Sequence, residues 1–505
     1  MNHIHTMYKL QKKHQTIQFH KIRNLQPLLA SLIVLKGVFN YKGMSYSKPL
    51  YVKMAKKEFY FGGSSVKKVN KNRLISMMLI PILLLSMLVT TPATTKAETD
   101  LGLTVDAAIL IDADSGKILY EQNADTPLGI ASMTKMMTEY LLLDAIKEGT
   151  VEWDQEYRVT TQTHKMSHNR LLSNVPLRAD GTYTIRELYE AMAIYSAYAA
   201  TVAIAETIAG TETEFVKLMN KKAEEMGLES YKFVNSTGLN NSDYEGLHPV
   251  GTGETDENVM SAKSVAKLAY LLIKNHPEVL ETSSIPRKVF REGTEDAIKM
   301  DNWNFMLPGL VFEYKGVDGI KTGTTDFAGQ SFTGTAKRGD TRLISVVMKA
   351  VDANGSSTRK ARFDATAKLF DYGFGQFSKQ EILPKNYKFK GSETIKVTKG
   401  KEKEVKIAAT EAVSLMVKNS EKDLYTPKLV LDTESLEADV EKGTVVGKVV
   451  IERSEGTDYG YIDGKNLEVD VVTTEAVERA GGISLFFKGI GSFFSNLWGS
   501  FLSLF

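Results

Sequence analysis

The sequence predicts a mixed α/β domain, followed by a small all-β domain and a C-terminal amphipathic helix. Three patterns support this order. Apolar residues at helical spacing occupy the middle of the chain, and β-prone segments lie on both sides of them. Short alternating segments separated by turn residues cover 389–472. Residues 483–505 place apolar side chains at i, i+3, i+4 and i+7.

Length and composition agree with a globular protein of several domains. A chain of 505 residues is too long for one ordinary domain, so two or three are expected. Hydrophobic residues make up 43% and charged residues 25%, as in typical globular chains. The chain has no cysteine. Disulfides, thiolate-bound zinc and a cysteine nucleophile are therefore excluded together.

Charge is distributed unevenly along the chain. The whole sequence has 63 Lys and Arg against 61 Asp and Glu, but residues 1–97 hold 16 of the basic residues and a single acid. The remainder therefore has 47 basic and 60 acidic residues, a net charge of −13. An acidic body repels phosphate backbones, so we expect no nucleic-acid partner.

An export signal is predicted at residues 66–97. Basic residues precede an apolar run over 74–89, and the small residues Thr95 and Ala97 offer a cleavage site before Glu98. The run of ~16 residues is short for a membrane span of about 20, although a permanent membrane helix is the alternative. Residues 1–65 precede this signal without clear periodicity. They are predicted to be a spurious or disordered leader from an over-long gene start, with a cytoplasmic tail as the alternative.

Each element of the first domain has its own local signal. The segment 105–120 is β-prone around a turn at 112–116, which predicts a hairpin. Ser132 opens a helix that Gly149 can end, and the capping box at 184–187 begins a second helix. Further elements are predicted as helices over 199–209, 212–227 and 261–275, and, after Pro308, as strands over 329–337 and 341–350.

The C-terminal part divides into two predicted units. Residues 385–475 contain short alternating stretches and are expected to form an all-β sandwich domain. Residues 483–505 carry a wide aromatic face opposite a small polar one. This pattern favours an interfacial membrane anchor, and a helix that packs on the β domain is the alternative.

The first chemical motif is Ser132-Met133-Thr134-Lys135. Residues three apart on a helix share a face, so the lysine amine can lie beside the serine hydroxyl. Serine is a poor nucleophile until a base takes its proton, and a buried lysine can lose its charge and act as that base. At a helix N-terminus the backbone N–H of Ser132 can also supply half of an oxyanion hole.

Two further motifs follow in order. Ser196-Ala197-Tyr198 is predicted at the junction of two helices, and Lys321-Thr322-Gly323 at the opening of a strand. The Lys321 ammonium and the Thr322 hydroxyl can bind a terminal carboxylate. Gly323 is small enough to let a substrate backbone lie alongside as an added strand.

Together these motifs resemble the Ser-x-x-Lys, Ser-x-Asn and Lys-Thr-Gly set of penicillin-binding proteins and serine β-lactamases. The flanking segments 130–138, 302–304, 316–323 and 369–374 are similar to those of the low-molecular-weight D-alanyl-D-alanine carboxypeptidases, peptidase family S11. The resemblance covers roughly 104–475. It implies a serine β-lactamase/transpeptidase-like α/β (α+β) catalytic domain over 104–378, followed by the β domain and the amphipathic anchor.

The resemblance also implies a mechanism. Ser132 attacks the carbonyl between the last two D-alanines of a peptidoglycan stem pentapeptide, with Lys135 as general base, and Ser196 relays a proton to the leaving D-alanine. Lys321 and Thr322 hold the terminal carboxylate, the backbone N–H groups of Ser132 and Thr324 bind the oxyanion, and water hydrolyses the acyl-enzyme. β-Lactam antibiotics are expected to acylate the same serine. The implied enzyme is exported, lies at the outer face of the membrane and needs no cofactor.

Tyr198 departs from the family's motif, which ends in asparagine. An asparagine amide can accept a hydrogen bond from a lysine and donate one to a substrate carbonyl, whereas a phenol has one oxygen and a different reach. Two interpretations remain open: a tolerated change, or slower turnover with acylation retained. Tyr198 is therefore included among the candidate substrate-binding residues.

Two other functions remain as alternatives. A β-lactamase needs a device that activates the deacylating water, and no Glu-x-x-x-Asn motif lies between Lys135 and Ser196. A catalytically weakened peptidoglycan-binding or regulatory protein is the second alternative, because of Tyr198. His164 and His168 have the i, i+4 spacing of metal ligands, but no nearby carboxylate completes a site, so no metal is expected.

Overall fold

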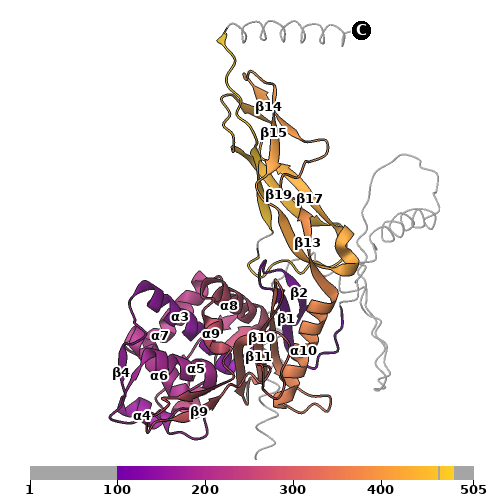
Figure 1. Ribbon diagram of the computed structural model, residues 1–505. Helices are drawn as coiled ribbons and strands as arrows, with labels where there is room; N and C mark the ends of the chain where they lie inside the picture. The colour runs from indigo at the N-terminus through magenta and orange to yellow at the C-terminus, as the bar shows by residue number, and fades with distance from the viewer. Residues whose placement is uncertain (1–98, 465–466, 483–505) are drawn as a thin grey trace, which may run out of the picture. The chain divides into compact units, whose positions relative to one another are not determined.

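The computed structural model of the protein describes residues 99–464 and 467–482 (Figure 1). The predicted leader 1–65, signal 66–97 and anchor helix 483–505 lie outside these residues. Within the described ranges, no helix is both long and apolar enough to cross a membrane.

A five-stranded antiparallel sheet forms the centre of the first domain, in the order β10 (Val317–Thr325), β11 (Gly329–Arg338), β12 (Thr341–Ala350), β1 (Ala107–Asp112), β2 (Ile118–Gln122). The predicted hairpins at 105–120 and 329–350 are confirmed. Strands from the two ends of the domain meet where β1 pairs with β12, and Ile109 lies opposite Val346. The domain is therefore closed by a contact between distant parts of the chain.

Both faces of this sheet are covered, which explains why β1 is apolar from Ala107 to Ile111. Ile109 and Ile111 belong to the core beneath α3 (Lys135–Glu148) and α8 (Ala262–Asn275). Ala108 and Leu110 face the opposite way, toward α10 (Arg359–Gln376). Because side chains alternate along a strand, a strand that is buried on both faces has an apolar run without alternation, here five of its six residues.

A helical layer lies beside the sheet and has its own core (Figure 1). The capping box at Thr184 and Glu187 begins α5 (Ile185–Tyr195), as predicted. Gly149 ends α3, as predicted, and Gly210 caps the end of α6. The remaining helices of the domain are α4 (Thr161–Ser167), α6 (Tyr198–Ala209), α7 (Glu212–Glu225), α9 (Val279–Ser283) and the short 3₁₀ helices η1 (Ala131–Thr134) and η2 (Asn241–Tyr244).

The first domain also contains one small three-stranded sheet and two two-stranded sheets. They are β3 (Pro127–Gly129) and β6 (Tyr231–Lys232) on either side of β7 (Val259–Ser261), β4 (Glu156–Arg158) with β5 (Thr182–Thr184), and β8 (Arg287–Phe290) with β9 (Ile298–Asp301).

Helix α10 corrects the expectation that only strands follow Pro308. It runs from Arg359 to Gln376 between the central sheet and the second domain. Its start lacks local support, since the N-cap residue Thr358 makes no side-chain capping hydrogen bond and the first turn contains no acidic residue. The helix is instead held by burial of residues such as Phe363 and Phe370 against the sheet.

The second domain is all β, as predicted. A six-stranded sheet, with the order β17-β19-β20-β15-β14-β18, and a two-stranded sheet, β13-β16, share one apolar core. The strands are β13 (Phe377–Leu383), β14 (Thr394–Thr398), β15 (Glu404–Ala409), β16 (Val413–Lys418), β17 (Tyr425–Leu431), β18 (Ser435–Glu437), β19 (Val445–Arg453) and β20 (Glu468–Thr473), with η3 (Asn419–Leu424) after β16. The mixed α/β and all-β fold class is thus confirmed.

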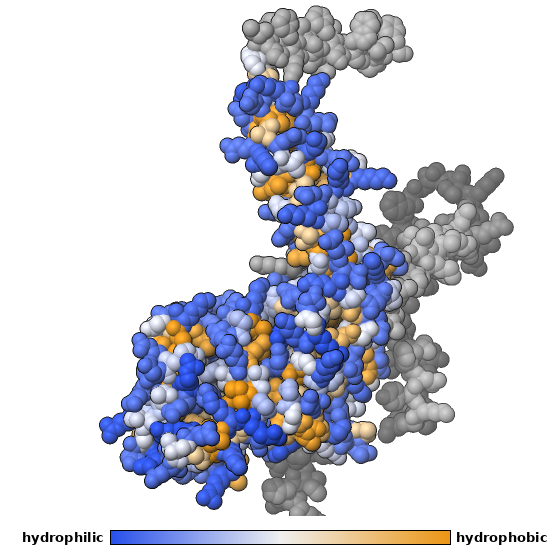
Figure 2. All heavy atoms as spheres, in the orientation of Figure 1, coloured by the Kyte–Doolittle hydropathy of each residue, from blue (hydrophilic) through white to orange (hydrophobic). Residues whose placement is uncertain are grey.

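The described surface is mainly hydrophilic on the face that Figure 2 shows, and apolar residues appear there in small scattered groups. The large apolar side chains are concentrated in the four buried cores.

Candidate active site

Ser132 and Lys135 lie together at the start of α3. Ser132 is in the 3₁₀ turn η1, and Lys135 is the first residue of the following helix. The Lys135 Nζ is 3.1 Å from the Ser132 Oγ and donates a hydrogen bond of 2.7 Å to the backbone oxygen of Thr237. The predicted proximity of serine and lysine is therefore present.

The environment of Lys135 favours a neutral amine. The side chain is only 1% exposed. Burial, and then the nearby charge of Lys321, hold the pKa of Lys135 well below its usual value, while Glu139 and Glu212 act in the opposite direction. An amine with a lowered pKa can accept the proton that Ser132 must lose to become a nucleophile.

The buried polar loop 235–238 contains the backbone oxygen that accepts the hydrogen bond of Lys135. The side-chain oxygen of Asn235 accepts hydrogen bonds from the backbone N–H groups of Thr237 and Gly238. Asn258 donates to the hydroxyl of Thr134, at 2.8 Å. Gly238 has a positive φ, and a Cβ there would overlap the carbonyl oxygen of Ala131. This loop was not singled out from the sequence, because its contacts join residues far apart in the chain.

Glu212 completes the support. Its carboxylate accepts hydrogen bonds from the backbone N–H and hydroxyl of Ser236 and from the hydroxyl of Tyr244. Burial raises the pKa of Glu212, and these hydrogen bonds oppose the rise. The Tyr244 hydroxyl also lies 2.8 Å from that of Thr237. The residue that receives the Lys135 hydrogen bond is thereby fixed in place.

Ser196 lies at the predicted helix junction. It caps α5 in the left-handed conformation, with φ of 60°, and its backbone turns the chain into α6. Its Oγ is buried and has no hydrogen-bond partner among the described residues. Because Ser196 also lines the same cleft as Ser132, its hydroxyl is available for proton transfer there.

Lys321-Thr322-Gly323 lies in the middle of β10, which begins at Val317, and not at the opening of a strand. A Cβ on residue 323 would overlap the carbonyl oxygen of Ile130. Glycine is therefore required where β10 packs against the Ser132 turn, a reason that differs from the space for substrate predicted from the sequence.

Lys321 and Glu139 add two buried charges behind the cleft. Lys321 is 3% exposed and Glu139 is 2% exposed. Burial lowers the pKa of Lys321 to about 8, with Glu139 opposing and Arg362 reinforcing the change. Burial raises the pKa of Glu139 to about 7, against the influence of Lys321 and Lys135. Glu139 thus interacts with both lysines, although the sequence motif did not include it.

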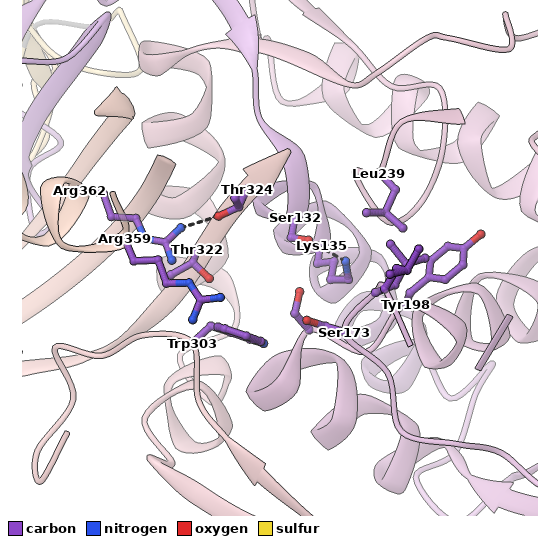
Figure 3. A pocket seen from close by; sticks show the side chains of 13 residues that line it. Ser132, Lys135, Ser173, Tyr198, Leu239, Trp303, Thr322, Thr324, Arg359 and Arg362 are labelled. Carbon is purple, nitrogen blue, oxygen red and sulfur yellow. Dashed lines mark hydrogen bonds between the residues drawn. The ribbon is translucent and has the colours of Figure 1, made fainter. Parts of the chain in front are cut away.

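Tyr198 turns away from the nucleophile. The side chain is 2% exposed, and its ring packs edge-on against Tyr244 with 5.1 Å between ring centroids. Figure 3 shows the phenol pointing away from Ser132 and Lys135. Burial raises the pKa of Tyr198 far above its usual value. The phenol therefore directs its hydroxyl away from Ser132 and Lys135, although Tyr198 contributes to the cleft wall.

The cleft has a volume of about 270 Å³ (Figure 3). The residues that line it are Ser132, Lys135, Leu171, Leu172, Ser173, Ser196, Tyr198, Leu239, Trp303, Thr322, Thr324, Arg359 and Arg362. Lys321 and Gly323 lie behind this wall. Arg359 and Arg362 were missed from the sequence, because α10 was not predicted as a helix.

The predicted histidine pair does not form a larger metal site. The rings of His164 and His168 lie 4.4 Å apart, centroid to centroid. The Nδ1 of His164 lies 2.7 Å from the backbone oxygen of Leu177. In the described part of the chain, no group of three or more His, Cys, Asp or Glu side chains is arranged to hold a metal ion.

Comparison with known proteins identifies relatives of both domains. A family model described as D-alanyl-D-alanine carboxypeptidase, Peptidase S11, matches residues 93–352. A model described as the C-terminal domain of penicillin-binding protein 5 matches residues 377–479.

Individual relatives agree with these matches. The D-alanyl-D-alanine carboxypeptidase DacF of Bacillus subtilis (strain 168) is 31% identical over 83% of this chain and 98% of its own length. DacA of Escherichia coli (strain K12) is 30% identical over 72% of this chain and 81% of its own.

Two solved structures are similar along most of their length. A structure described as a peptidoglycan synthesis regulatory factor (PBP3) from Streptococcus pneumoniae is 34% identical, with a TM-score of 0.63, over 74% of this chain and 100% of its own. Penicillin binding protein 5 of Haemophilus influenzae is 27% identical, with a TM-score of 0.59, over 75% of this chain and 98% of its own.

Proposed function

This chain belongs to the D-alanyl-D-alanine carboxypeptidase family, and on that premise we propose that Ser132, Lys135 and Ser196 perform its reaction. It is a serine peptidase and a hydrolase, as its carboxypeptidase relatives are named. The single observation that supports the assignment of residues is the 3.1 Å separation of the Ser132 Oγ from the buried Lys135 Nζ.

In the first step, Lys135 takes the proton of Ser132 while the Oγ attacks the carbonyl carbon between the last two D-alanines of a stem pentapeptide. The negative oxygen that forms is stabilised by the backbone N–H groups of Ser132 and Thr324. Removing one such donor typically slows catalysis ~100- to 1,000-fold. The position of the Ser132 turn against β10 therefore affects the reaction rate directly, because it sets the two N–H groups side by side.

In the second step, the C–N bond breaks and the amine of D-alanine must gain a proton. The Ser196 hydroxyl, which has no hydrogen-bond partner among the described residues, is suited to pass a proton from Lys135 to that nitrogen. Water then attacks the ester carbonyl carbon on Ser132 while Lys135 takes a proton from the water, and this proton passes to the Ser132 Oγ as the ester C–O bond breaks. The free enzyme and a peptide shortened by one residue result.

Thr322 and Lys321 receive the terminal carboxylate in this proposal. Thr322 lines the cleft, and Lys321 lies directly behind it on β10. Penicillin carries a carbonyl and a carboxylate at a similar separation, and proteins of this kind are named for binding it. We therefore expect β-lactams to acylate Ser132 and to leave slowly.

The orientation of Tyr198 supports slower hydrolysis of the acyl-enzyme. Its phenol points into the helical core, so Tyr198 does not give the cleft the amide that the family motif supplies. Acylation depends on Ser132 and Lys135 and should persist, whereas placement of the acyl group for hydrolysis should suffer. A protein that binds peptidoglycan with weak turnover is therefore the second candidate function.

Release of D-alanine from a cell-wall pentapeptide tests these assignments. The wild-type chain should release D-alanine, and a Ser132→Ala variant should not. Penicillin should leave a lasting adduct on Ser132, whereas rapid loss of the drug would identify a β-lactamase. Intact peptide binding without any release would favour the regulatory alternative.

The site of action is proposed to lie outside the cytoplasm, where the family's peptidoglycan substrate is found. Export through residues 66–97 and docking of residues 483–505 on the outer face of the membrane remain proposals from the sequence. A chain truncated after residue 482 should shift from the membrane fraction to the soluble fraction, if the proposed anchor is correct.

A further inference from the structure

Glu212 is a buried acid that has no opposite charge beside it. The residue is 7% exposed and forms no ion pair with any described residue. It lies in the first turn of α7, where the helix dipole favours an acid. The same turn contains Glu214, which is exposed and pairs with Lys217. Stabilisation of the helix therefore does not require a buried carboxylate, and the inward position of Glu212 needs another explanation.

The hydrogen bonds of Glu212 favour its negative form. Its Oε1 accepts from the backbone N–H of Ser236 at 2.9 Å, from the Ser236 hydroxyl at 2.6 Å and from the Tyr244 hydroxyl at 2.8 Å. Burial raises the pKa of Glu212, but each of these three donors opposes the rise. Hydrogen bonds to a charged acceptor are stronger than those between neutral groups. Glu212 therefore holds Ser236 and Tyr244 firmly in place.

Both residues held by Glu212 touch the acceptor of Lys135. Ser236 directly precedes Thr237, and the Tyr244 hydroxyl lies 2.8 Å from the Thr237 hydroxyl. Because Tyr244 donates its proton to Glu212, its oxygen can accept the proton of Thr237. The backbone oxygen of Thr237 in turn accepts the 2.7 Å hydrogen bond from the Lys135 Nζ. A continuous chain of contacts thus leads from the buried carboxylate to the amine.

The charge of Glu212 acts on the same amine. Glu212 and Glu139 both raise the pKa of Lys135, whereas burial and the charge of Lys321 lower it. The ammonium that forms when Lys135 takes a proton is therefore favoured from two sides, by Glu139 on its own helix and by Glu212 on α7.

Two further titratable groups face Glu212 from α6. The charge of Glu206 adds to the rise in the pKa of Glu212, and Glu212 adds to the rise in the pKa of Tyr198. Tyr198 lines the cleft and packs against Tyr244, which does not line it. The contacts between Glu212 and Tyr244 are therefore separated from the cleft by protein.

We propose that Glu212 and Tyr244 are positioning residues for the reaction at Ser132, and that they hold the Thr237 carbonyl oxygen against Lys135 so that the amine stays directed at the Ser132 Oγ. This inference rests on the proposed function and adds to it two residues outside the three sequence motifs. Neither residue is among those that line the cleft, so both act through Thr237 and not on the substrate.

The test compares full-length wild type with Glu212→Gln, Tyr244→Phe and the double variant. Each is mixed with benzylpenicillin over a range of concentrations, and adduct formation on Ser132 is followed by intact-protein mass. This separates the limiting rate of acylation from the penicillin concentration that gives half of it. The measurement is repeated from about pH 5 to pH 9, at a temperature well below thermal unfolding of each variant.

Tyr157→Phe is the matched control. The Tyr157 hydroxyl is also a buried donor to a glutamate of the helical layer, Glu206. Its other partner is the hydroxyl of Thr163, which does not belong to the 235–238 loop. This variant therefore removes the same kind of hydrogen bond without touching the acceptor of Lys135.

The expected result is a loss in rate without a loss in binding. On the high-pH plateau, Tyr244→Phe should lower the limiting rate roughly 3- to 10-fold, and Glu212→Gln roughly 10- to 100-fold. The half-saturating concentration should stay within about twofold of wild type. The double variant should match Glu212→Gln within about twofold, because both changes interrupt one chain of contacts.

The pH profile gives a second readout, which a purely structural role would not move. Since the charge of Glu212 raises the pKa of Lys135, Glu212→Gln should lower that pKa. Acylation depends on the neutral amine, so its rise with pH should begin at lower pH in this variant. Tyr157→Phe should keep the rate and the pH profile of wild type.

Three results would overturn the inference. Losses that multiply in the double variant would show two independent effects, and an equal loss in Tyr157→Phe would show general loosening of the helical layer. An unchanged limiting rate in Tyr244→Phe would exclude the hold on Thr237, and this variant decides the question alone if Glu212→Gln does not fold. Failure of the proposed function gives a different result, since wild type itself would then form no adduct on Ser132.

Discussion

The carbonyl oxygen of Ile130 packs so closely against Gly323 that no Cβ fits between them. This contact joins the turn before Ser132 to the centre of β10, and it brings Ser132 into the same cleft as Thr322 and Thr324. The glycine of the Lys-Thr-Gly motif is thus explained by packing of the two halves of the site. The distance between the Ser132 turn and β10 depends on this contact.

Gly323→Ala should push β10 away from the Ser132 turn. We expect acylation by penicillin to fall at least about tenfold and stability to fall by roughly 1–3 kcal/mol, as for overpacking of a core. Gly375→Ala is the control, because Gly375 lies near the end of α10 and a Cβ added there would meet no other atom within 4 Å. Adduct formation and thermal unfolding of both variants check this, and equal behaviour of the two would contradict it.

Lys135→Met should abolish base catalysis while preserving the bulk of the side chain. The expected loss in acylation rate is ~100- to 10,000-fold, the usual contribution of a general base. Lys147→Met, on the exposed part of the same helix, should change the rate little. Single-turnover kinetics measure both. A loss below tenfold in Lys135→Met would exclude Lys135 as the base.

Glu139→Gln should change the pH dependence of acylation. The Glu139 carboxylate raises the pKa of Lys135, so removing its charge should lower that pKa further. Since the rate depends on neutral Lys135, its rise with pH should begin at lower pH in the variant. The pH profile between about 5 and 9 measures the shift, with exposed Glu148→Gln as control. A shift to higher pH, or none, would show that Glu139 does not act on Lys135.

Tyr198→Asn should raise release of D-alanine by roughly tenfold and change acylation by penicillin little, because an amide is restored where the acyl group must be held. Loss of a buried ring also costs about 3–5 kcal/mol of stability, so thermal unfolding must be measured and the assay run well below the transition. Identical rates of D-alanine release in folded wild type and variant would show that the tyrosine is a tolerated change.

Local spacing was sufficient for several elements of this protein. Ser132 and Lys135 are three residues apart on one helical segment, so their proximity follows from helix geometry alone. The hairpin at 105–120 and the capping box at Thr184 are equally local, and both are present. The start of α10 was missed because it does not depend on local contacts. Thr358 makes no capping hydrogen bond, and burial against the sheet holds the helix in place.

The sequence by itself determined the proximity of Ser132 and Lys135 and the order of the two domains, because each depends on residues within a few positions of one another. Only the tertiary structure decided which groups surround them. Lys135 donates to Thr237, 102 positions away, and Arg362 reaches Gly323 across 39 positions. The direction of Tyr198, the electrostatic influence of Glu139 on Lys321 and the position of Arg359 near Trp303 follow from packing between distant segments. Periodicity along the chain contains no information about those distances.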